Sequence, residues 1–170
     1  MNQKTAMKLF GLLGLLMLLS CGYADRHRNS SSCEQALVDS LEVRVQDSLF
    51  SNVHYSRSQL LEALTQTQDS LVYYRLLALY GKTFFVSSDF DSILYYNRRV
   101  KEFSRNASQS SESLQSPRWN DVLSDVYNIE GNVWMQLNRP DSAIIDYKKA
   151  YGYRLEGKKL HLLPDICINI

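Results

Sequence analysis

The sequence contains little cysteine, proline or glycine, and neither sign of charge is in excess. Of its 170 residues, three are cysteine, three are proline and seven are glycine. Three cysteines are too few for a disulfide scaffold, and the low glycine content argues against an enzyme built on glycine-rich loops. The formal net charge is +1, whereas a nucleic-acid-binding surface needs a marked basic excess. With 45% hydrophobic residues, the composition is that of a single globular domain.

The longest apolar run, at residues 9–19 (LFGLLGLLMLL), is also short. A helix that spans a bilayer needs about 20 apolar residues, so this run is too short for a stable membrane helix. Lys4 and Lys8 precede the run, and Ser20 follows it. A charged start, a short apolar stretch and a small residue predict a secretory signal peptide over residues 1–20. The alternatives are an ordinary signal peptide cleaved after Ala24 and an uncleaved anchor.

The end of this segment reads Leu18-Leu19-Ser20-Cys21 and resembles the lipobox of bacterial lipoproteins. The resemblance implies that Cys21 is lipidated (palmitate or a similar acyl chain) and becomes the new N-terminus. Two or more acyl chains hold a protein stably on a membrane. Residues 21–32 are polar and predict a flexible tether. Because no Asp follows Cys21, the resemblance favours the periplasmic side of the outer membrane over the inner membrane.

From residue 31 onward, apolar residues recur with a helical period and no segment shows strand-like alternation, which predicts an all-α fold. A Ser-x-x-Glu capping box at residues 31–34 begins one helix, and a second is predicted over residues 58–66. Together they form an N-terminal helical pair over residues 33–68. Further helix starts are predicted at Asp69, Asp89, Pro117, Pro140 and Pro164, with a loop over residues 106–116.

The helices predicted after Asp69 and Asp89 repeat fifty residues later in those after Pro117 and Pro140. This shift aligns Gly81 with Gly131, Phe84 with Trp134, Asp91 with Asp141, Ile93 with Ala143 and Val100 with Ala150. The order of small and aromatic residues resembles the tetratricopeptide repeat (TPR). The resemblance implies antiparallel helix pairs stacked as a short solenoid over residues 69–170, with a third repeat truncated. TPR units recur every 34 residues or so, and the excess of about 16 residues falls around the predicted loop.

The resemblance also implies a partner-binding groove lined by the first helix of each pair. The positions it selects are Arg75, Ala78, Lys82, Phe85, Val86, Asp125, Asn128, Asn132, Met135 and Gln136. Carboxamides can both donate to and accept from a peptide backbone, while Phe and Met supply adaptable apolar contacts. The alternative is that these side chains are ordinary solvent-exposed surface. The paired small and aromatic residues, in contrast, are interpreted as core packing.

Patterns typical of catalysis or metal binding are missing from the sequence. No two histidines have a metal-ligand spacing, and there is no nucleophile elbow or phosphate-binding loop. Asp121 and Asp125 lie four residues apart, and we interpret them as a solvated helix face rather than a catalytic pair. The sequence thus predicts no enzyme activity, no cofactor, no metal and no nucleic-acid partner.

An Asp-Ser-aliphatic or Asp-Ser-Ala triplet occurs five times, and it is similar to the acceptor pattern of some bacterial periplasmic O-glycosylation systems. The serines concerned are Ser40, Ser48, Ser70, Ser92 and Ser142. The alternative is that these Asp residues cap helices, because their carboxylates suit a helix N-terminus.

Taken together, the patterns predict a non-enzymatic, membrane-anchored TPR scaffold that binds a protein or peptide partner in the cell envelope. One alternative is the truncated N-terminal sensor region of a TPR-containing signalling or transcription regulator, because the last predicted helix stops after about two turns. Another is an accessory subunit of an enzyme or a hydrolase.

Overall fold

The computed structural model describes residues 35–107 and 116–169. The chain divides into two compact units, Met1–Ser40 and Leu41–Ile170. Of the first unit, residues 35–40 are described, and they are helical. The predicted signal peptide, the tether with Cys21 and most of the predicted loop over residues 106–116 lie outside the described residues.

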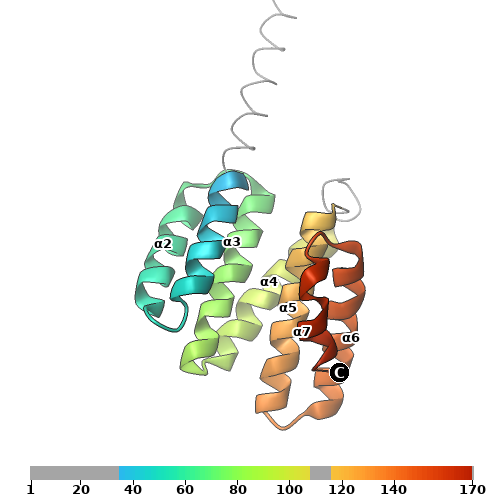
Figure 1. Cartoon of the computed structure of the whole chain (residues 1–170). Coiled ribbons are helices and arrows are strands. Elements are labelled where there is room, and N and C mark those ends of the chain that lie inside the picture. The colour runs from blue at the N-terminus through green and yellow to red at the C-terminus, as the bar shows by residue number, and fades with distance from the viewer. Residues whose placement is uncertain (1–34, 108–115, 170) are drawn as a thin grey trace, which may run out of the picture. The chain divides into compact units, whose positions relative to one another are not determined.

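The described part of the second unit consists of helices (Figure 1). After a helical segment over residues 41–48 come α2 (Val53–Gln66), α3 (Ser70–Lys82), the 3-10 helix η1 (Thr83–Ser87), α4 (Phe90–Ala107), α5 (Pro117–Gln136), α6 (Pro140–Glu156), η3 (Leu160–Leu162) and α7 (Leu163–Cys167). No strand occurs among the described residues, so the predicted all-α class is confirmed for this part of the chain.

Side-chain caps set the helix starts, largely as the sequence predicts. The Asp69 carboxylate accepts hydrogen bonds from the backbone N–H groups of Leu71 (2.8 Å) and Val72. Ser116 caps α5, and Pro117 occupies its first turn, where a missing N–H costs nothing. The predicted start of α2 at residue 58 is wrong. That helix begins five residues earlier because the side chain of Asn52 accepts from the Tyr55 N–H at 3.1 Å.

Two turns end the first helices of successive pairs with the same backbone conformation. Ser88, after η1, has φ 52°, and Asn138, after α5, has φ 57°. Both values are left-handed, a conformation that Asn tolerates better than Ser because its short amide can bond locally. The backbone N–H of Arg139 then donates to the Trp134 carbonyl at 2.8 Å, which closes the end of α5. The chain therefore reverses at both points within three residues.

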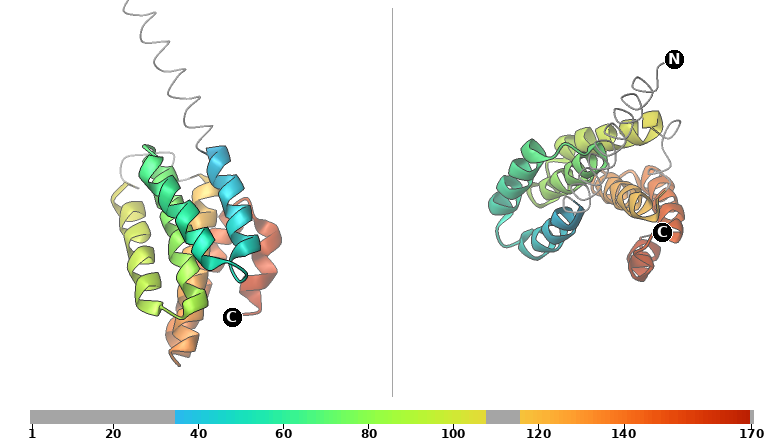
Figure 2. Two further views of the ribbon diagram at one scale, coloured as in Figure 1. Left: turned by 90° about the vertical axis from the view of Figure 1, so that its left-hand side faces the viewer. Right: turned by 90° about the horizontal axis from the view of Figure 1, so that it is seen from above.

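Consecutive helices pack on one another: α2 on α3, α3 on α4, and α5 on α6 (Figure 2). A Cβ added at Gly131 would lie 2.3 Å from the Tyr147 ring, and one added at Gly81 would lie 2.9 Å from the Cβ of Tyr96. Each glycine is therefore required for the close approach of its helix pair. The core on these pairs includes the buried residues Leu77, Val100, Trp119, Leu123 and Val126 in one cluster and Ile93, Ile129 and Val133 in another.

Candidate functional site

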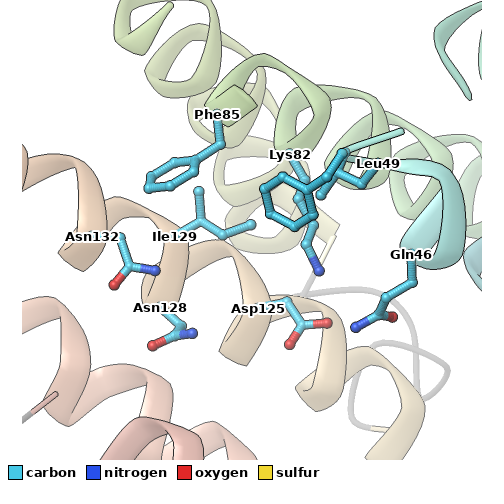
Figure 3. Close-up of a pocket in the computed structure, with 9 residues that line it drawn as sticks. Gln46, Leu49, Lys82, Phe85, Asp125, Asn128, Ile129 and Asn132 are labelled. Atoms are coloured by element: carbon cyan, nitrogen blue, oxygen red, sulfur yellow. The ribbon is translucent and has the colours of Figure 1, made fainter. Parts of the chain in front are cut away.

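A cavity of about 220 Å³ opens between the end of α3, its 3-10 extension and α5 (Figure 3). It is lined by Gln46, Leu49, Phe50, Lys82, Phe85, Asp125, Asn128, Ile129 and Asn132. Figure 3 shows the Phe85 ring beside Ile129, while Asp125, Asn128 and Asn132 follow one another along α5. Since these three lie three or four residues apart, they occupy one face of the helix.

The lining of this cavity combines apolar side chains with uncharged polar ones. Leu49 and Ile129 are buried, whereas the neighbouring Phe50 is 82% exposed. Phe50 therefore adds an exposed apolar side chain beside the other apolar residues that line the cavity. Gln46, Asn128 and Asn132 supply carboxamides, and Lys82 and Asp125 add one charge of each sign.

A second cavity of about 420 Å³ continues from the first, because Phe85 and Asn132 line both. Its other lining residues are Met135, Gln136, Tyr147, Ile168 and Asn169. Met135 and Ile168 are largely exposed, so this cavity too presents apolar side chains to solvent. We refer to the two cavities together as the groove.

Hydrogen bonds within the protein orient the two asparagines of the groove. The Tyr147 hydroxyl donates to Asn132 Oδ1 at 2.8 Å, and the Asn169 amide donates to Asn128 Oδ1 at 3.3 Å. Burial raises the pKa of Tyr147 above its usual value of 10.0, so its hydroxyl remains a donor at neutral pH. Each bond uses one of the two acceptor sites of the amide oxygen, which leaves the second site and the NH₂ donors for a ligand.

Seven of the ten positions singled out from the sequence line the groove: Lys82, Phe85, Asp125, Asn128, Asn132, Met135 and Gln136. Arg75 does not, because it is only 6% exposed and pairs with Glu42 at 3.7 Å. Its assignment to the groove is therefore corrected: Arg75 is a buried ion-pair residue. Ala78 packs against the core, and Val86 lines neither cavity.

Segments outside the two aligned helix pairs also line the groove, and the sequence did not predict them. Gln46, Leu49 and Phe50 come from the end of the helical segment before α2, and Ile168 and Asn169 follow α7. The fifty-residue shift aligns only α3–α4 with α5–α6, so it cannot predict that these five positions line the groove.

Of the two aspartates that the sequence placed on a solvated helix face, Asp121 is buried and Asp125 is half-buried. Arg154, 2% exposed, donates to Asp121 Oδ1 at 3.0 Å and also to Asp125 Oδ1. Asp121 further accepts the backbone N–H groups of Lys158 and Lys159, each at 3.1 Å. The prediction of a solvated pair is wrong for Asp121, because a guanidinium on α6, 33 residues away in the sequence, binds it and also reaches Asp125.

The serines of the Asp-Ser triplets differ in accessibility. Ser40 and Ser70 are exposed, and Ser48, Ser92 and Ser142 are half-buried. The Ser92 hydroxyl donates to Asp89 Oδ2 at 2.7 Å, and that of Ser48 donates to the Arg44 carbonyl at 2.6 Å. In these two cases the hydroxyl belongs to a local helix interaction. O-glycosylation at the five serines stays a prediction.

Across residues 35–107 and 116–169, no group of three or more His, Cys, Asp or Glu side chains is placed to hold a metal ion. Within the same described ranges, no helix combines the length and apolarity needed to cross a bilayer. Comparison of the chain with protein-family models, curated proteins and solved structures returns no match.

Proposed function

We propose that this protein is a non-enzymatic, lipid-anchored scaffold of stacked TPR-like helix pairs, whose groove binds an extended segment of a protein partner in the cell envelope. The observation that carries the proposal is the groove itself, in which exposed apolar side chains alternate with oriented carboxamides. An extended peptide has unpaired N–H and C=O groups that need partners on binding, and carboxamides can satisfy either kind.

The solenoid part of the proposal is supported by the packing of the two helix pairs. In each, a glycine of the first helix lies against the second helix at a distance that no larger residue would permit. Both first helices end in a left-handed residue fifty positions apart, Ser88 and Asn138. A recurring helix pair with a recurring turn is what a repeat array requires.

The groove residues suggest what kind of segment would bind. Phe50, Phe85 and Ile129 form an apolar wall suited to one aliphatic or aromatic side chain. Asn128, Asn132 and Gln136 follow along α5 and can contact the backbone on either side of that anchor. The charged residues of the groove are Lys82 and Asp125, and the Asp125 carboxylate is already paired with Arg154, so the groove favours neither a strongly acidic nor a strongly basic segment.

Anchoring through Cys21 rests on the lipobox resemblance alone, and its test is separate from that of the groove. Lipidation predicts that the mature chain begins at Cys21 and that its N-terminal peptide carries the mass of the acyl modification, and Cys21→Ala abolishes both the acyl mass and cleavage before residue 21. An unmodified mass for the protein isolated from its native membrane would contradict the anchor and leave the groove proposal intact.

The binding proposal is tested by selecting peptides from a random display library on the purified full chain. Selected peptides are expected to lose affinity by about tenfold when Phe85 is changed to Ala, because truncating a central apolar anchor costs at least 1.4 kcal/mol or so. Ile145→Ala is the matched control, since Ile145 is an exposed apolar residue of α6 outside the groove.

The role of Asn132 needs a separate control, because its side chain also holds Tyr147. Asn132→Ala removes both the amide and that bond, whereas Tyr147→Phe removes only the bond. We expect Asn132→Ala to weaken peptide binding more than Tyr147→Phe does. Peptides that bind all four variants equally would place the binding surface elsewhere. In the alternative, in which the chain is the N-terminal sensor region of a larger regulator, the same groove would bind the input.

A further inference from the structure

A third cavity, of about 400 Å³, lies where α4, α5 and α6 meet, and it shares no residue with the groove. We call it the basic pocket. It is lined by Lys101, Ser104, Arg105, Leu123, Tyr127, Lys149 and Tyr153. Lys101 and Arg105 lie four residues apart on one face of α4, and Lys149 approaches from α6. Three cations from two helices therefore converge on one cavity.

Two of these cations are held in place by carboxylates beneath them. Lys101 Nζ lies 2.5 Å from Glu130 Oε2, and Lys149 Nζ lies 3.1 Å from Asp146 Oδ1. Each ammonium has three N–H donors, so one such bond leaves two donors for a ligand. Burial is the main effect on Glu130 and raises its pKa, while the bond from Lys101 opposes the shift.

Arg105 carries the uncompensated charge of the basic pocket. Among the described residues, no carboxylate lies within ion-pair distance of its guanidinium. The three cations and the two carboxylates leave a local charge of +1. The side chain of Arg105 is exposed and can turn its planar set of donors toward an oxyanion without losing an existing partner.

Aromatic rings form the wall between the cations. Tyr127 stacks on Tyr153 with 5.7 Å between ring centroids, and the Nζ atoms of Lys101 and Lys149 lie 5.2 Å and 5.0 Å from the Tyr127 centroid. Burial is the largest effect that raises the pKa of Tyr127, to about 12. Its phenol is therefore neutral at physiological pH and adds no negative charge to the pocket. Both lysines are restrained by a ring as well as by a carboxylate.

We propose that the basic pocket binds a phosphoryl group, carried by a soluble organic phosphate or by an anionic phospholipid headgroup. A phosphate monoester has close to two negative charges and three acceptor oxygens, which matches donors from Lys101, Arg105 and Lys149 better than a single carboxylate does. The proposal is independent of the groove, because the two sites have no residue in common.

The test is titration of the purified full chain with inorganic pyrophosphate at low ionic strength, followed by calorimetry. Saturable binding is expected, and Arg105→Gln is expected to weaken it about tenfold, since a charge-assisted contact is lost. The matched control is Arg98→Gln, which removes the same charge from an exposed position of α4 outside the pocket. Binding by this control is expected to stay within about twofold of the parent.

A second arm distinguishes the two sources of the phosphoryl group. Co-sedimentation compares phosphatidylcholine vesicles with and without phosphatidic acid, and only the part of the gain that is lost in the pocket variants is assigned to the basic pocket, because cationic residues elsewhere also favour an anionic surface. A gain from phosphatidic acid that Arg105→Gln and Lys149→Gln remove identifies a lipid headgroup, and pyrophosphate binding without that gain identifies a soluble phosphate. The proposal would be overturned if neither pyrophosphate binding nor a gain from phosphatidic acid is found. It would also be overturned if Arg98→Gln weakens binding as much as Arg105→Gln does. Unchanged melting temperatures of the variants show that the fold is retained.

Discussion

The two helix pairs of the second unit, α3–α4 and α5–α6, are held together by different kinds of side chain. Between α3 and α4 the contacts are mainly aromatic. Tyr80 meets Tyr96 edge-on at 5.2 Å between ring centroids, and Tyr74 stacks on Phe103 at 4.0 Å. Such contacts depend on area and tolerate small rotations of the rings.

Between α5 and α6 the contacts are hydrogen bonds and ion pairs in addition to apolar packing. Ser124 Oγ donates to the Ala150 carbonyl at 2.8 Å, Trp134 Nε1 donates to Asp146 Oδ2 at 2.8 Å, and Arg154 binds Asp121. Directional bonds of this kind fix the register of one helix on the other, and each buried partner left alone is costly.

The relative position of the two helices is therefore fixed more closely in α5–α6 than in α3–α4. Most of the groove's carboxamides lie on α5, the helix with the directional bonds, whereas α3 and its 3-10 extension supply Phe85 and Lys82. The oriented carboxamides therefore sit on the firmly registered pair, and the adaptable aromatic contact comes from the other.

Arg154→Ala is expected to cause the largest loss of stability, about 3–5 kcal/mol in the free energy of unfolding. The substitution leaves the buried carboxylate of Asp121 without its cationic partner and removes the tie between α6 and α5. Urea denaturation followed by circular dichroism measures the change. Arg98→Ala, at an exposed position of α4, is the control and is expected to change stability little. Similar losses in both variants would show that the buried ion pair does not hold α5–α6 together.

Gly131→Ala is expected to reduce stability by about 1–3 kcal/mol, because the new Cβ overlaps the buried Tyr147 ring. Gly81→Ala is expected to cost less, since its Cβ meets a single atom at 2.9 Å and alanine favours a helix by about 1 kcal/mol. Gly152→Ala, with no atom within 4 Å, is expected to be stabilising. Thermal denaturation of the three variants gives the order, and a Gly131→Ala as stable as Gly152→Ala would refute the close approach of α5 and α6.

The left-handed residues Ser88 and Asn138, which end the first helix of each pair, differ in how well they tolerate a positive φ. Ser88→Gly is expected to raise stability by about 0.5–1 kcal/mol, because glycine adopts a positive φ without a Cβ penalty. Asn138→Gly is expected to gain less, since Asn already tolerates this conformation. The two melting temperatures, measured side by side, test the claim. A larger gain at Asn138 would mean that the turn after η1 is not strained.

The smallest effect concerns the pH dependence of the α4 cap. The Ser92 side chain, and then its backbone N–H, donate to Asp89 and lower the pKa of that carboxyl from 3.8. Because the pKa is lower in the folded than in the unfolded state, the charge stabilises the fold above pH 3.8, and this contribution is lost as the pH falls through the folded value. Asp89→Asn is therefore expected to lower the melting temperature slightly at pH 7.

The control for this cap is Asp91→Asn, which removes the same charge from an exposed position that makes no bond to Ser92. The difference between Asp89→Asn and the parent protein is expected to close below pH 3.8. A difference that persists unchanged into acid would show that the charge of Asp89 plays no part.

Local signals in the sequence predicted the all-α class of the described residues and most of the helix starts. Capping residues and prolines, such as Asp69 and Pro117, act on the backbone within three residues, so their effect can be read without knowing the tertiary structure. The start of α2 was missed because Asn52 follows a turn and precedes a stretch with weak apolar periodicity.

The site was predictable only where it repeats along the chain. The resemblance to the tetratricopeptide repeat selected Phe85 and Asn132, whereas Phe50 and Ile168 reach the groove through tertiary packing. Charged residues were the least predictable. The burial of Arg75 and the pairing of Asp121 with Arg154 depend on partners 33 residues away in each case. Helical periodicity cannot reveal such partners, because it records which face a residue occupies but not what lies opposite.

The central claim is that the groove is the surface that this protein uses, and photo-crosslinking tests it most directly. A benzophenone amino acid placed at Phe85 reports on the groove, and the same group at Ile145 reports on an exposed position of α6 outside it. When cells that make the protein are irradiated, we expect the variant with the group at position 85 to form a covalent adduct with a discrete partner. We expect no adduct from the variant with the group at position 145. An adduct from position 145 alone, or equal adducts from both, would contradict it.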